Sequence, residues 1–184
     1  MLSSAIHQKL SIKVQTVGAL IALVSAVALP QAIHAVGAAS GMGTSLGEAL
    51  LPMHLPVILA GLLAGPCAAG IAGLLSPLVS FLLTGMPSAA ILPFMMLELC
   101  VYGVCAGLLR NVRMPAVLKV LVIQLSGRAI RAAAILIAFY GMGGTVQPSV
   151  IFTSVAAGLM GIILQLVIIP LAVYRFKEAD NEHP

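Results

Sequence analysis

Six long apolar stretches, separated by short polar segments, dominate the pattern of hydrophobic and polar positions along the chain. Such stretches are typical of helices that cross the roughly 30 Å hydrocarbon core of a bilayer. We predict helices at about 14–37, 53–65, 67–85, 91–110, 115–140 and 149–174. The second is too short to cross alone unless it tilts or borrows residues from the loop before it. The predicted fold is an all-α membrane protein with six transmembrane helices in a single domain, residues 1–184.

Composition agrees with this class and excludes several others. Hydrophobic residues make up 61% of the chain and charged residues 8%, whereas globular domains carry about 25% charged residues. The net charge of +4 comes from short flanks and does not indicate nucleic-acid binding. Cys67, Cys100 and Cys105 lie in apolar runs without C-x-x-C spacing, so they predict neither a metal site nor a disulfide. We expect no metal, no cofactor and no nucleic-acid partner.

The basic residues outside the apolar stretches predict the orientation. They are Lys9 and Lys13 before the first helix, Arg110, Arg113 and Lys119 between the fourth and fifth, and Arg175 and Lys177 after the sixth. Six spans place these flanks on one side, which the positive-inside rule makes cytoplasmic, together with both termini. The loops at 38–52, 86–90 and 141–148 then face outward, and they contain neither Lys nor Arg.

A signal peptide is the competing interpretation of the N-terminus. Lys9 and Lys13, the following apolar run and "AIHAVGA" resemble an n-region, an h-region and a small-residue cleavage site. Cleavage would leave five spans and an outward N-terminus. We favour six spans because the apolar run is long for an h-region.

Two arginines stand inside the fifth predicted helix. Gln124, Arg128 and Arg131 are spaced i, i+4 and i+7, so they share one face. Arg128 lies about 18 Å from either end of the helix, near mid-membrane. An arginine at such a depth costs about 2.5–3.5 kcal/mol even on mild insertion scales. The bundle interior or a wet cavity must therefore accommodate this face.

Glu98 is the only acidic residue inside a predicted span. Its depth from the outer end of its helix is similar to that of Arg131, so the two can pair. The pair could have a purely structural role, in which it holds the fourth and fifth helices together. Even then, one arginine would still lack a partner. An unmatched arginine beside a cavity is a good receptor for a carboxylate, which it can bind through two hydrogen bonds. We therefore expect Arg128 and Arg131 to face a binding pocket.

Other side chains could join this pocket. His54 lies at the outer start of the second helix, although a lone histidine there is as often interfacial or capping. Tyr102 follows Glu98 by one turn, and Met95 could supply an adaptable apolar wall or plain packing. Gln165 lies mid-span in the sixth helix, where it either joins the pocket or simply links helices. The Gly- and Ser-rich segment 36–54 is either a flap over the pocket or an inert linker.

Small residues recur along the first helix. Gly18, Ala22 and Ala26 are four apart and allow close approach of another helix. The stripe can pack against a helix of the same chain or can dock a separate membrane subunit.

These features together resemble the substrate-binding S-component of an energy-coupling factor (ECF) vitamin importer. The specific motifs are P-M-H-x-P-V, G-x-x-x-G-P, S-P-L, T-G-M-P and E-x-x-x-Y-G-x-x-x-G-L-L, within residues 51–110, followed by S-G-R at 126–128. The Gly18, Ala22 and Ala26 stripe is similar to the family's A-x-x-x-A docking surface. The resemblance implies six helices, a vitamin site near the outer face, and the first outer loop as a lid.

The resemblance also implies how such a protein works. An S-component captures its vitamin and docks onto a transmembrane T-component, which couples to two cytoplasmic ATPases. It is not an enzyme and binds no ATP, and the chain carries no G-x-x-x-x-G-K-[ST] motif. The expected location is the cell membrane of a prokaryote. The buried arginines favour an anionic vitamin, with pantothenate as the best fit. Folate, biotin, lipoate, niacin and a cobalamin precursor stay open.

Three other classes compete with this interpretation. An intramembrane hydrolase would need Ser40 and His54 as a pair, with no evident oxyanion donors. A stand-alone transporter is disfavoured by only six spans without an inverted repeat. A structural or assembly subunit would use the buried charges only to hold helices together.

Overall fold

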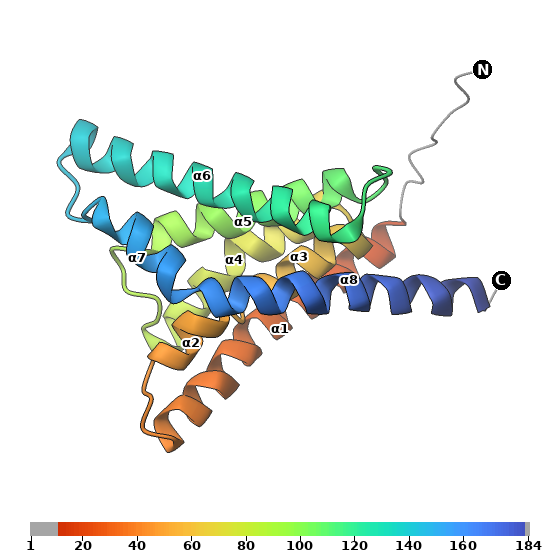
Figure 1. Ribbon diagram of the computed structural model, residues 1–184, viewed down its shortest axis with the longest axis horizontal. Helices are drawn as coiled ribbons and strands as arrows, with labels where there is room; N and C mark the ends of the chain where they lie inside the picture. The colour runs from red at the N-terminus through yellow and green to blue at the C-terminus, as the bar shows by residue number, and fades with distance from the viewer. Residues whose placement is uncertain (1–10, 183–184) are drawn as a thin grey trace.

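The computed structural model describes residues 11–182, and every regular element in that range is a helix. The all-α prediction is therefore confirmed. The helices are α1 (Ile12–Ala39), α2 (Ser45–Leu50), α3 (His54–Ala64), α4 (Pro66–Thr84), α5 (Leu92–Leu109), α6 (Ala116–Met142), α7 (Ser149–Ala157) and α8 (Leu159–Glu182). Figure 1 shows the long helices running side by side, with α2 and α7 as short helices at one end of the bundle.

Six segments are long and apolar enough to cross a membrane, as the sequence predicts. Four of them are the single helices α1, α4, α5 and α6, and the last is the stretch Leu159–Phe176 of α8. The remaining one, Ser45–Ala64, joins α2 and α3. The second predicted helix therefore reaches membrane-spanning length by borrowing residues from the preceding segment, because α3 alone has 11 residues.

The segment between the first two spans is partly helical, although the sequence predicts a loop at 38–52. α1 continues to Ala39, and α2 occupies Ser45–Leu50. The Ser45 hydroxyl donates to Met42 O at 2.6 Å, and Glu48 lies in the first turn of α2, where a carboxylate suits the helix dipole. Leu51 ends this helix with a φ of 48°, in the left-handed region. A short helix therefore stands where the sequence predicts only a connection.

The last predicted helix, 149–174, is interrupted. α7 ends at Ala157, Gly158 separates it from α8, and α8 continues to Glu182. The side chain of Leu51 occupies the space beside Gly158, since a Cβ there would lie 2.7 Å from Leu51 Cδ1. The break therefore depends on a tertiary contact that the local apolar pattern does not reveal.

Glycines allow the central helices α4 and α5 to pack closely. A Cβ on Gly73 would clash with the backbone of Leu99, and one on Gly103 would clash with the backbone of Ala69. Close packing of small residues is the main source of helix association inside a membrane, where lipid removes the hydrophobic contribution. This contact fixes the end of α5 that carries Glu98.

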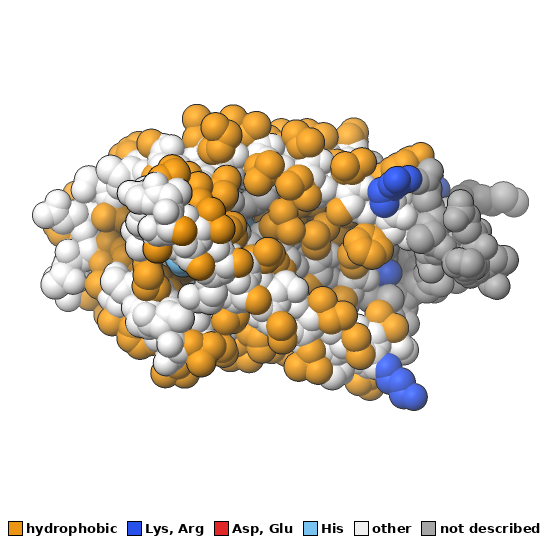
Figure 2. Space-filling model, turned by 90° about the horizontal axis from the view of Figure 1, so that it is seen from below, with side chains coloured by type: hydrophobic (Ala, Val, Ile, Leu, Met, Phe, Trp, Pro, Cys, Tyr) orange, Lys and Arg blue, Asp and Glu red, His pale blue; other side chains and the backbone are white. Residues whose placement is uncertain are grey.

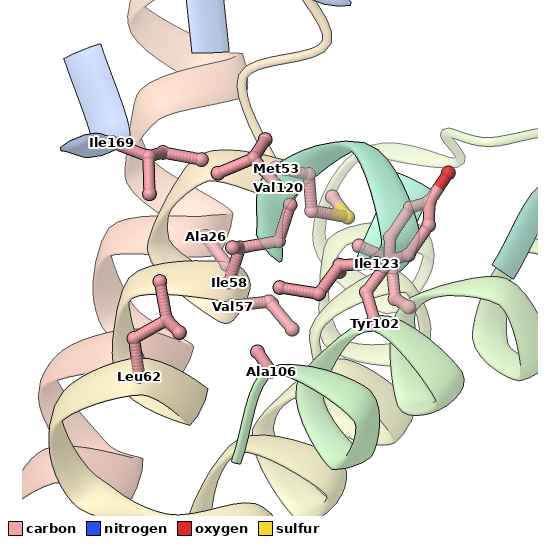
Figure 3. Close-up of a cluster of buried hydrophobic side chains, with 11 residues drawn as sticks. Ala26, Met53, Val57, Ile58, Leu62, Tyr102, Ala106, Val120, Ile123 and Ile169 are labelled. Carbon is pink, nitrogen blue, oxygen red and sulfur yellow. The ribbon is translucent and has the colours of Figure 1, made fainter. Parts of the chain in front are cut away.

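The main apolar cluster lies where α3, α5, α6 and α8 meet. Figure 3 shows Tyr102 of α5 beside Val57 and Ile58 of α3 and Ile123 of α6, with its hydroxyl pointing away from the aliphatic side chains. All four side chains are fully buried. The cluster therefore holds the two helices that carry Glu98 and the arginines in a defined register.

The small-residue stripe of α1 packs within the chain in this structure, and docking of a partner through it stays a prediction. A Cβ on Gly18 would clash with the Cβ of Ala64 in α3. Ala22 and Ala26 are 3% and 0% exposed. These side chains are therefore buried against α3 and α4 of the same chain.

The two ends of the bundle differ in charge. Lys13 begins α1, Arg110 and Arg113 lie between α5 and α6, and Arg175 lies late in α8. Figure 1 shows α1 beginning and α8 ending at the same end of the molecule. Figure 2 shows hydrophobic side chains along the flank of the bundle and basic side chains at that end. Lys9 and the side chain of Lys177 lie outside the described residues.

Candidate functional site

A cavity of about 540 Å³ opens at the end of the bundle away from Lys13 and Arg175. Volumes of this size suit a small organic ligand. The wall combines the C-terminal half of α1, α2, the starts of α3 and α5, the end of α4, the middle of α6, and α7. Among the residues predicted from the sequence, the lining contains His54, Met95, Arg128 and Arg131.

Glu98 sits fully buried behind this cavity and is bonded through both carboxylate oxygens. Arg131 Nη1 donates to Glu98 Oε2 at 2.9 Å, and the Tyr102 hydroxyl donates to Glu98 Oε1 at 2.8 Å. The pair considered from the sequence is therefore formed, and Tyr102 supports it from one turn away. A second cavity of about 20 Å³, lined by Glu98, Arg128 and Arg131, lies beside the carboxylate.

Arg128 has a different environment, although it lies on the same helix face as Arg131. Its Nε and Nη2 atoms are buried without a hydrogen-bond partner within the described part of the chain. The Nε of Arg131 is also unbonded there. The bonds that Glu98 accepts in the described structure come from Arg131 and Tyr102, and none comes from Arg128. Two guanidinium groups and one carboxylate leave one positive charge at the cavity wall.

His54 adds an unsatisfied imidazole to the same wall. The side chain is 2% exposed, and neither Nδ1 nor Nε2 has a partner among residues 11–176, whose side chains are described. Its ring centroid lies 5.3 Å from that of Tyr102, tilted by 53°. A neutral imidazole has one donor and one acceptor, and leaving each unsatisfied when buried costs about 1–3 kcal/mol. A ligand or water in the cavity would remove that cost.

Gln124 and Tyr102 are expected ligand contacts from the sequence, but neither lines the cavity. Gln124 Nε2 donates to Gln165 Oε1 at 2.9 Å, and Gln165 Nε2 donates to Leu51 O at 3.2 Å. These bonds connect α6, α8 and the turn between α2 and α3. Gln124 and Gln165 thus link helices, while Tyr102 holds Glu98.

Several lining residues are not anticipated from the sequence. They include His34 in α1, Glu48 in α2, Ser80 in α4, and Thr153 and Ser154 in α7. His34 lies in a stretch that resembles a signal-peptide cleavage site, and Ser80 lies in an otherwise apolar run. No local signal marks them, because only the meeting of distant helices brings them to one cavity.

The structure does not form the Ser40 and His54 pair that a hydrolase would require. The Ser40 hydroxyl donates to Gly37 O at 3.2 Å, within its own helix end. Both ring nitrogens of His54 lack partners in the described range, so neither bonds the serine. Ser40 is also absent from the wall of the cavity that His54 lines.

Comparison with protein families supplies the identity of this arrangement. Residues 13–173 match the family described as ECF transporter, substrate-specific component. No curated protein and no solved structure matches the chain significantly. The family match begins in α1 and ends in α8, so it reaches all six candidate spans and includes every described residue around the cavity. The chain is a multi-pass membrane protein that belongs to the substrate-specific components of ECF transporters.

Proposed function

We propose that this subunit captures an anionic, water-soluble vitamin or vitamin precursor in the 540 Å³ cavity, with Arg128 as the principal anion-binding group. A pantothenate-like carboxylate is the best candidate for the cargo. The family implies a small-molecule substrate, a T-component and ATPase subunits as partners. Delivery then follows docking of the loaded subunit to the T-component in a prokaryotic plasma membrane.

The observation that carries this proposal is the unbonded guanidinium of Arg128 at the cavity wall. A buried cation without a partner is costly, and a carboxylate that accepts two hydrogen bonds from it offsets that cost. Arg131 also lines the cavity, but its charge is matched by Glu98. The site as a whole therefore favours a ligand with a single negative charge in contact with α6.

The charge at the two ends of the bundle supports the orientation. The basic residues Lys13, Arg113 and Arg175 lie at the end away from the cavity, and the positive-inside rule places that end in the cytoplasm. The cavity then opens toward the outside, where a nutrient is captured. Both termini would lie in the cytoplasm.

A thermal-shift screen of the detergent-purified protein tests the ligand class. The panel contains the anionic vitamins pantothenate, biotin, folate, lipoate and nicotinate, with thiamine and riboflavin as cationic and neutral comparisons. A ligand at about 100 times its dissociation constant stabilises the folded protein by about 2.7 kcal/mol. Mass spectrometry of molecules that co-purify with the protein identifies cargo outside the panel.

Variants connect any shift to the proposed group. Arg128→Gln should abolish the shift, whereas Arg113→Gln, an exposed arginine between α5 and α6, should retain it. Binding of thiamine or riboflavin in preference to every anion would contradict the proposal. Equal binding of the anion by Arg128→Gln and the unsubstituted protein would also contradict it.

A further inference from the structure

A second group of polar side chains lines the cavity on α1 and α4, and the anion site does not use it. His34 of α1 and Ser80 of α4 both line the cavity. The Nδ1 atom of His34 is buried and has no partner in the described structure. An unsatisfied polar atom in a side chain that lines a cavity indicates a place where a ligand group or water can complete the hydrogen bond.

Ser80 is held ready to donate a hydrogen bond. Gln31 Nε2 donates to Ser80 Oγ at 3.4 Å, so the serine oxygen already accepts one bond. The hydroxyl hydrogen has no acceptor among the bonds that the described residues form. Gln31 and His34 are three residues apart on α1 and therefore lie on the same face. The side chain of Ser80 is only 2% exposed, which limits its access to bulk water.

The short helix α2 covers the imidazole ring of His34. A Cβ on Gly47 would lie 2.5 Å from Cε1 of His34, so the backbone of α2 rests directly against the imidazole ring. The next residue, Glu48, also lines the cavity. Its carboxylate makes this side unfavourable for a second anionic group, because like charges repel.

The two polar groups lie on different sides of the cavity. Figure 1 shows the outer half of α1 and the middle of α6 on opposite sides of the bundle. The same wall also contains apolar side chains, among them Met53, Ile91 and Met95. The cavity wall therefore combines a cationic group at Arg128, apolar side chains, and hydrogen-bonding groups at His34 and Ser80 on the side where Glu48 disfavours a second anion.

We propose that His34 and Ser80 form a second ligand subsite, which binds an uncharged hydrogen-bonding group such as a hydroxyl, an amide or a ring nitrogen. The cargo is then an elongated monoanion that is polar at both ends. This inference rests on the proposed capture of an anion by Arg128, and it adds what the far end of the same molecule must carry.

Binding measurements on matched variants test the subsite. The probe is the anionic vitamin with the largest thermal shift in the panel, titrated by calorimetry against the purified protein. Biotin and lipoate form an informative pair, because both carry a carboxylate on a similar aliphatic chain. Biotin has a polar ureido group at its far end, whereas lipoate has an apolar dithiolane ring. We expect biotin to bind at least tenfold more tightly than lipoate.

The serine variants provide the closest control. Ser80→Ala should weaken probe binding about 3- to 10-fold, as expected for one lost hydrogen bond to an uncharged group. Ser76→Ala should not change it, because Ser76 is equally buried one turn earlier on α4 and does not line the cavity. His34→Leu should weaken binding about tenfold and remove the preference for biotin over lipoate. If His34→Leu fails to fold, the serine pair still decides the question.

The outcomes separate the subsite from the anion site. Loss of affinity in Ser80→Ala and His34→Leu, together with a cargo polar at both ends, supports the subsite. If these variants bind the probe as tightly as Ser76→Ala while Arg128→Gln does not bind, the subsite is wrong and the anion site stands. A preference for lipoate over biotin would also refute the subsite, while leaving the anion site at Arg128 intact. If no anion binds and none co-purifies, the proposed function fails, and this inference fails with it.

Discussion

Arg131 donates a hydrogen bond to Glu98 across the contact between α6 and α5, with 2.9 Å between Nη1 and Oε2. The Glu98 side chain is 0% exposed, and that of Arg131 is 14% exposed. Tyr102 donates to the other carboxylate oxygen, and Arg128 forms no bond with Glu98 in the described structure, so Arg128, and not Arg131, presents the unmatched charge to the cavity.

Glu98→Gln should destabilise the protein by about 3–5 kcal/mol, because removal of one partner leaves a buried charge uncompensated. Denaturant unfolding in detergent, followed by circular dichroism, measures the free energy of unfolding. The double variant Glu98→Gln with Arg131→Met should recover part of the loss, since it removes the orphaned cation as well. Equal stability of Glu98→Gln and the unsubstituted protein would show that the pair contributes nothing.

Arg128→Met should have the opposite effect on the ligand-free protein. The substitution removes a guanidinium whose Nε and Nη2 are buried without partners in the described structure. We expect the free energy of unfolding without ligand to rise by about 1–3 kcal/mol. The same variant should lose all stabilisation by anionic ligand. Lower stability of Arg128→Met in the absence of ligand would mean that the arginine has a structural partner.

Gln165→Leu should loosen the segment that covers the cavity. Gln165 joins Gln124 to Leu51 O, and its loss leaves both without their bonds. We expect a destabilisation of about 1–3 kcal/mol. Amide hydrogen exchange, read by mass spectrometry, should become faster in residues 44–53 than in residues 92–109. Gln147→Leu, in the exposed turn before α7, is the control and should leave exchange unchanged. Identical exchange in the two variants would refute the link.

Gly103→Ala should disrupt the contact between α4 and α5. The added methyl group would clash with the backbone of Ala69, which cannot move like a flexible side chain. Overpacking of this kind costs about 1–3 kcal/mol or more. Gly141→Ala is the matched control, because a Cβ there meets open space and its φ is not positive. Thermal unfolding in detergent compares the two, and equal melting temperatures would argue against close packing at Gly103.

The sequence predicts much of the fold because a membrane imposes simple requirements on each helix separately. Every backbone polar group in hydrocarbon must be bonded within the segment, so long apolar runs become helices. Their number and their approximate bounds follow from the sequence. The helix α2 and the break at Gly158 do not follow, since α2 has only six residues and the break lies against Leu51 from another part of the chain.

The residues of the candidate site also fall into those that the sequence reveals and those that it does not. Glu98, Arg128 and Arg131 are visible in the sequence because ionisable residues inside apolar helices are rare and costly. His34, Ser80 and Glu48 carry no such signal, since histidine, serine and an acidic residue near a helix end are ordinary. Gln124 shows that a shared helix face does not by itself place a side chain in the cavity. It shares a helix face with the arginines, yet it bonds Gln165 instead of lining the cavity.

The small-residue stripe shows most directly what only the tertiary structure decides. Gly18, Ala22 and Ala26 determine from the sequence that some helix approaches α1 closely. Which helix approaches depends on the arrangement of the bundle, and here α3 and α4 of the same chain do so. The sequence by itself thus determined the membrane class, the six spans and the buried charges, because these depend on composition and local period. The tertiary structure decided which arginine is unmatched, which polar groups share the cavity and what the stripe contacts, because those depend on how distant helices meet.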